Sequence, residues 1–96
     1  MSEETVYTLL HKQLEEQREM FIDEVNKQNL SVNEIYEKTG INKTSLYSFL
    51  GRRQLNMKPY NAMKLTQLLG KDFMKKLYIT MKTHMAELEV EEKYSN

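Results

Sequence analysis

The side chains of this chain that could bind a charged ligand gather in its middle, where basic residues are frequent and acids are missing. Between Glu37 and Asp72 lie 34 consecutive residues with seven Lys or Arg and no Asp or Glu. Nine basic residues and one acid give residues 38–76 a net charge of +8, although the 96-residue chain is neutral overall. Residues 1–37 and 77–96 are both acidic. A basic segment of this kind favours a phosphate-bearing partner such as a nucleic acid.

Within this basic segment, the residue pattern predicts two short helices joined by a tight turn. Ser31 has the side chain of a helix cap and precedes a helix over residues 32–39. Gly40 can end that helix because glycine tolerates a positive φ. Asn42 then caps a second helix over residues 43–50. The apolar residues expected to lock the two helices together are Ile35, Ile41, Leu46 and Phe49.

Two such helices form a helix-turn-helix, whose second helix enters the major groove of DNA. Its exposed side chains would then meet the base edges, where hydroxyl and amine groups can form hydrogen bonds. The residues expected to read bases are Lys43, Thr44, Tyr47 and Ser48.

The rest of the chain predicts a helical frame, and the expected fold class is all-α with five helices. Apolar residues recur at helical spacing over residues 3–28, with Asn29 as the stop. A break is an alternative at residues 13–19, which are nearly all polar. Pro59 suits the first turn of a fourth helix ending near Leu69, and a fifth runs from about Lys71 to Glu91. One Pro and three Gly leave few turns for an all-β fold.

The segment VNEIYEKTGINKTSLYSFLGRR, with a fourth helix closing on KLTQLLG, resembles the lambda-repressor/Cro-type (XRE-like) family of bacterial and phage regulators. The resemblance covers about residues 18–73 and implies a five-helix DNA-binding domain that binds operators as a dimer and represses transcription. By position it implies base reading by Lys43, Thr44 and Ser48. The chain differs at Tyr36, where alanine is usual, and at Val32, where glutamine is usual. The residues expected to bind phosphate are Asn42, Ser45, Arg52, Arg53 and Lys58.

The length predicts a single domain over residues 1–96. Its helix-turn-helix core, residues 18–73, is flanked by an N-terminal helical extension over 1–17 and a C-terminal helix over 74–96 that is expected to dimerise. Apolar stripes continue along both flanks, and a homodimer reading a palindromic operator would bury them. Folding back onto the domain is the alternative. The residues expected in the dimer interface are Leu77, Met81, His84, Leu88, Val6, Leu10 and Leu14.

Several classes of site have no residues to support them. The chain lacks cysteine, and neither His11 nor His84 has a second His at metal-binding spacing, so neither a metal nor another cofactor is expected. No glycine-rich phosphate loop or Ser/His/Asp grouping indicates an enzyme. The longest apolar run is three residues, which is too short to span a membrane. The expected location is the bacterial cytoplasm.

The expected function is therefore a sequence-specific duplex-DNA-binding transcriptional regulator, a repressor of phage, plasmid or other mobile-element origin. The alternative is a helical protein-binding module, such as an antirepressor or an inhibitor that docks on host transcription or defence machinery. The acidic ends and the long outer helices motivate that alternative, because both exceed what operator binding requires.

Overall fold

The structure, a computed structural model, describes residues 3–94, and the described chain is all-α with five helices and no strand. The helices are α1 (Glu3–Lys27), α2 (Val32–Thr39), α3 (Lys43–Leu50), α4 (Pro59–Leu69) and α5 (Lys71–Tyr94). The predicted fold class is confirmed. Helix α1 runs through residues 13–19 without a break, and α5 continues past Glu91 to Tyr94.

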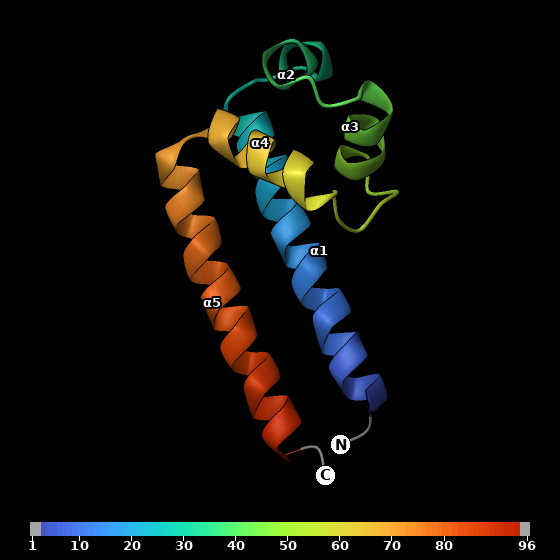
Figure 1. Cartoon of the computed structure of the whole chain (residues 1–96), viewed down its shortest axis with the longest axis vertical. Coiled ribbons are helices and arrows are strands. Elements are labelled where there is room, and N and C mark those ends of the chain that lie inside the picture. The colour runs from blue at the N-terminus through green and yellow to red at the C-terminus, as the bar shows by residue number, and fades with distance from the viewer. Residues whose placement is uncertain (1–2, 95–96) are drawn as a thin grey trace.

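Helices α1 and α5 lie side by side and antiparallel, and they form a two-helix stalk (Figure 1). Helices α2, α3 and α4 gather at the end of the stalk where α1 ends and α5 begins, and together they form the head. The molecule is elongated, with extents of 48 × 26 × 21 Å. The basic segment predicted from the sequence therefore occupies the head, with its last residues on the first turns of α5.

Local signals set the helix ends in the head. Ser31 and Glu34 form the capping box, with the Glu34 amide donating to the Ser31 hydroxyl over 3.1 Å. Gly40 follows α2 with φ +75°, which a residue carrying a Cβ would adopt only under strain. The Asn42 side chain accepts a hydrogen bond of 2.7 Å from the Thr44 amide and starts α3. Asn29 ends α1 with φ +59°, so its predicted left-handed conformation is confirmed.

The core of the head ties α3 to α1, and through the Phe21 ring of α1 to the start of α5. The Phe21 ring of α1 lies 5.6 Å from the Phe49 ring of α3 and 5.0 Å from the Phe73 ring of α5, centre to centre. Leu46, on α3, is completely buried. Burying side chains of this size stabilises the fold by about 1.5–3 kcal/mol each. Because α3 is fixed on its inner face, its outer face has a defined orientation.

A polar cluster joins the two helices of the stalk within one chain. His84 of α5 is 5% exposed, and its Nε2 lies 2.8 Å from a carboxylate oxygen of Glu16 on α1. Its Nδ1 lies 3.0 Å from Gln17 Nε2, and Gln13 donates a hydrogen bond of 2.9 Å to its backbone carbonyl. The side chain of Gln13 is itself buried. The expected continuous helix is thus observed, and the alternative of a break does not occur, because these polar residues bind α5.

This pairing corrects the expected positions of two dimer-interface residues. Leu77 and His84 are covered within their own chain, Leu77 in the hydrophobic core and His84 in the polar cluster with α1, so they are not available to a second copy. Val6, Leu14 and Leu88 are partly buried, whereas Leu10 and Met81 are exposed. The homodimer itself stays a prediction. None of the helices over residues 3–94 combines the length and apolar character required to cross a bilayer.

Candidate nucleic-acid interface

The outer face of α3 presents three of the four side chains expected to read bases. Lys43, Thr44 and Tyr47 are exposed, and Tyr47 leaves 58% of its surface accessible. Ser48 is half-buried. Its carbonyl oxygen accepts the backbone amides of Arg53 and Gln54 over 2.7 and 3.0 Å, so the loop after α3 is tied to the helix it follows.

Tyr36 of α2 extends this face toward the start of α3. The Nζ atom of Lys43 lies 5.1 Å from the centre of the Tyr36 ring, within the range of a cation–π interaction. Tyr36 is 43% exposed, whereas its neighbour Ile35 is completely buried. The large residue at this position therefore does not separate α2 from α3, and it positions a lysine that faces solvent.

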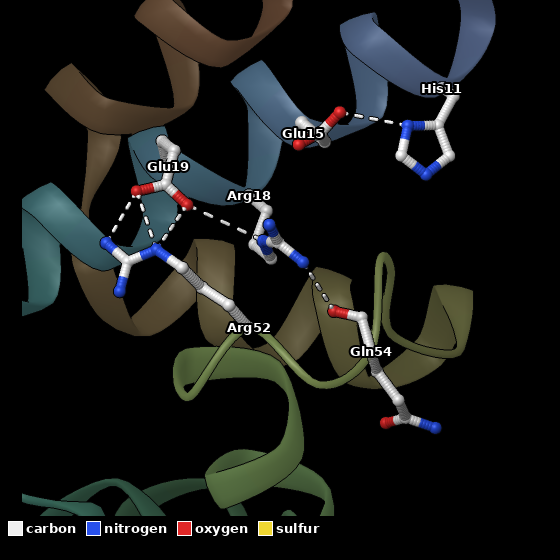
Figure 2. A network of polar contacts seen from close by, with 6 residues as sticks. All are labelled: His11, Glu15, Arg18, Glu19, Arg52 and Gln54. Atoms are coloured by element: carbon white, nitrogen blue, oxygen red, sulfur yellow. Dashed lines mark hydrogen bonds and ion pairs between the residues drawn. The ribbon is translucent and has the colours of Figure 1, made fainter. Parts of the chain in front are cut away.

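The loop after α3 carries two arginines whose surroundings differ. Arg52 has φ +62° and binds Glu19 of α1, with Nη2 2.6 Å from Oε1 and Nε 2.9 Å from Oε2 (Figure 2). Hydrogen bonding and charge attraction from Arg52 lower the pKa of Glu19, and the carboxylate in turn raises the pKa of Arg52. Arg53 is exposed and forms no ion pair with any residue the structure describes. In this structure Arg53 is therefore accessible to a phosphate, whereas Arg52 is held by a carboxylate.

Arg18 provides the second link from α1 to the same loop. Its side chain is 9% exposed, and Nη1 donates a hydrogen bond of 3.2 Å to the carbonyl oxygen of Gln54 (Figure 2). Its Nε lies 3.5 Å from the Glu19 carboxylate and has no hydrogen-bond partner. Neighbouring residues of α1 therefore hold the loop at Arg52 and at Gln54. Nothing in the sequence indicated either contact, because the partners are 33 and 36 residues apart.

A cleft of about 330 Å³, lined by both polar and apolar side chains, lies between α3, the loop and the start of α4. It contains Ser45 and Lys58, both expected to bind phosphate. Lys58 is exposed and precedes α4, whose first turn has no side-chain cap from this residue. Unpaired amides at a helix start favour an anion. The other lining residues, none of them expected from the sequence to bind a ligand, are Gln54, Asn56, Met57, Pro59 and Asn61.

The structure thus presents three of the four predicted base-reading residues on the outer face of α3, and the phosphate candidates lie on α3 or in the segment that follows it, except Asn42, which precedes α3. Asn42 acts as the cap of α3, and its single side-chain oxygen, Oδ1, accepts the Thr44 amide. Within residues 3–94, no three His, Asp or Glu side chains come together as metal ligands. Comparison with known protein families, with curated proteins and with solved structures finds no match to this chain. The family resemblance therefore stays a prediction from the sequence motif.

Proposed function

We propose that this chain is a sequence-specific duplex-DNA-binding transcriptional regulator, a repressor of the lambda-repressor/Cro type from a phage, plasmid or other mobile element. One observation carries the proposal. Helix α3 has a face of exposed polar and basic side chains, its opposite face is buried, and it stands in a head that contains the acid-free basic segment. A rigid helix with this surface fits the major groove of DNA.

In the proposed complex, the first turn of α3 approaches the base edges. The ammonium group of Lys43 donates hydrogen bonds to purine acceptors such as guanine O6 and N7, and the Thr44 hydroxyl either donates or accepts. Tyr47, one turn further along, contacts bases or the sugar edge. Tyr36 limits the positions that the Lys43 side chain can take, because the cation rests on its ring.

The phosphate backbone is bound by groups beside this helix. Arg53 is exposed in the loop that follows α3, and the cleft containing Ser45 and Lys58 lies between α3, this loop and α4. Contacts of this kind set register and supply most of the affinity, and they make the affinity fall as salt rises.

Selection of bound duplexes from a random pool, with the full chain as bait, tests the proposal. We expect one sequence motif to be enriched. The logarithm of the binding constant for that motif should fall linearly with the logarithm of the salt concentration. Substituting Lys12, an exposed lysine of the stalk, with Ala provides the matched control and leaves motif and affinity unchanged. A pool that shows no enriched motif contradicts the proposal.

The protein-binding module remains the second candidate. The stalk projects from the head, and its acidic C-terminal part, residues 77–94, has no role in the proposed DNA contact (Figure 1). A pull-down from nuclease-treated bacterial lysate separates the two functions. A stoichiometric heterologous partner, combined with absence of any DNA preference, favours the module.

A further inference from the structure

A cleft of about 410 Å³ lies where α1 ends and α5 begins, on the side of the head away from α3 (Figure 1). Gln28 ties its two sides together, because its side-chain amide donates hydrogen bonds of 2.7 Å to the Leu69 carbonyl oxygen and to the Glu24 carboxylate. The volume lies in the range that small-molecule sites occupy. The cleft can therefore hold a compact ligand.

Four lysines from two helices line this cleft, one on α1 and three on the first two turns of α5. They are Lys27, Lys71, Lys75 and Lys76. All four are exposed, and none forms an ion pair with any residue between 3 and 94. The cleft also contains two acids, Glu24 and Asp72, so its side chains leave a net charge of +2.

These lysines are not explained by the proposed DNA contact or by helix stability. The three lysines of α5 belong to the basic segment 38–76 but lie away from α3. Lys71 is the first residue of α5, where the helix dipole disfavours a cation. Lys71 and Lys75 are four residues apart on one helix, so their like charges repel each other. An anion bound between them would remove this repulsion.

We propose that this cleft binds a small phosphorylated molecule. Lysine ammonium groups bind phosphate as point charges, and here they approach from α1 on one side and from α5 on the other. The carboxylate of Glu24 favours a ligand that also carries hydroxyl or amino donors, such as a sugar phosphate or a nucleotide. The backbone of duplex DNA offers the same phosphate chemistry, but a duplex is much wider than this cleft.

The bound molecule bridges the last turn of α1 and the first turns of α5, at the junction of the stalk and the head. It therefore restrains the position of the two helices relative to each other. This site does not depend on the proposed function, because no residue of the DNA contact lines it.

Titration of the free full chain with inorganic pyrophosphate, at constant ionic strength, tests the site without DNA. Calorimetry should give saturable binding, with a dissociation constant of about 1 mM or lower. In a ¹⁵N–¹H correlation spectrum, the amide shifts should be confined to the residues that line the cleft. Sodium chloride at the same ionic strength is the control for simple charge screening.

Substitutions on both helices then test whether the lysines act as one site. Lys27→Gln and Lys75→Gln should each weaken pyrophosphate binding roughly threefold to tenfold. Asp72→Asn should strengthen it, because a carboxylate that repels the anion is removed. Lys82→Gln is the matched control, an exposed lysine of α5 outside the cleft, and should leave the affinity unchanged. All four positions are exposed, so circular dichroism is expected to show the wild-type fold.

Three results would overturn the proposal. The first is an absence of saturable binding, including shifts that sodium chloride reproduces. The second is a pyrophosphate affinity that neither Lys27→Gln nor Lys75→Gln changes. The third is a pair of lysine variants that lose affinity for a duplex of arbitrary sequence but not for pyrophosphate, because these lysines would then serve the DNA backbone.

Discussion

Replacing Glu19 with Gln should steepen the salt dependence of DNA binding, because it releases an arginine for the phosphate backbone. In the structure, Glu19 holds the guanidinium of Arg52 through two of its nitrogens, at 2.6 to 3.1 Å. A phosphate must compete with this carboxylate. Gln has the same size but no charge, so Arg52 becomes free to turn toward DNA. Each added phosphate contact changes the slope of log K against log salt by about 0.9.

The expected change is therefore about 0.9 per protomer, or about 1.8 for a dimer on two half-sites. Fluorescence anisotropy with a labelled duplex, at salt from about 50 to 300 mM, measures it. Adding Arg52→Gln to the Glu19→Gln variant should return the slope to the wild-type value. Glu15→Gln is the matched control, since Glu15 also lies on α1 but binds His11 instead of the loop (Figure 2).

One result would refute this reasoning. If Arg52→Gln flattens the slope of the wild type by the full 0.9 and Glu19→Gln leaves it unchanged, then Arg52 already leaves Glu19 when DNA binds. The contact would then serve only to order the loop in the free protein.

Three further predictions concern the loop and its supports. Arg53→Ala should weaken binding to all duplexes about equally and reduce the slope by about 0.9 per protomer, as salt titrations on two unrelated duplexes would show. Gly51→Ala should lower both the midpoint of urea unfolding and the DNA affinity. The added Cβ would lie 2.6 Å from the Tyr47 carbonyl oxygen, so the end of α3 must shift. An unchanged urea midpoint contradicts this prediction. The arginine partner lowers the pKa of Glu19, so the stabilising effect of their pair is complete above the ordinary glutamate value of 4.5 and is lost as pH falls through the lowered pKa. Urea titrations of wild type and Glu19→Gln should therefore differ at pH 7 and converge in acid.

The parts of the fold that the sequence predicted are those set by neighbouring residues. The bounds of α2 and α3 follow from a capping box at Ser31, a glycine in the left-handed region and the Asn42 side chain, all within a few residues of the helix ends. The buried face of α3 follows from its apolar spacing, with Leu46 and Phe49 in the core. These signals act between neighbouring residues, so the helix bounds and the buried face of α3 can be predicted from the sequence alone.

The unpredicted features depend on contacts between distant segments. The polar middle of α1 left a break open as an alternative, because the sequence does not show that Gln13 and Gln17 bind His84 some 70 residues later. Because of the same contacts, His84 is buried between α1 and α5 and not in the dimer interface expected from the sequence. The Glu19–Arg52 pair could likewise not be predicted, because a half-buried glutamate of α1 gives no local indication of a partner 33 residues away.

The central claim is that α3 reads base sequence. Its most direct test is a selection from one random duplex pool with three proteins, the wild type, Lys43→Ala and Arg53→Ala, followed by comparison of the selected motifs. We expect Lys43→Ala to lose preference at one or two adjacent base positions, at about 1–3 kcal/mol for a good base contact. Arg53→Ala should retain the wild-type motif with uniformly weaker binding. If Lys43→Ala selects the same motif as the wild type at every position, or if none of the three proteins enriches a motif, α3 does not read the sequence and the account is contradicted.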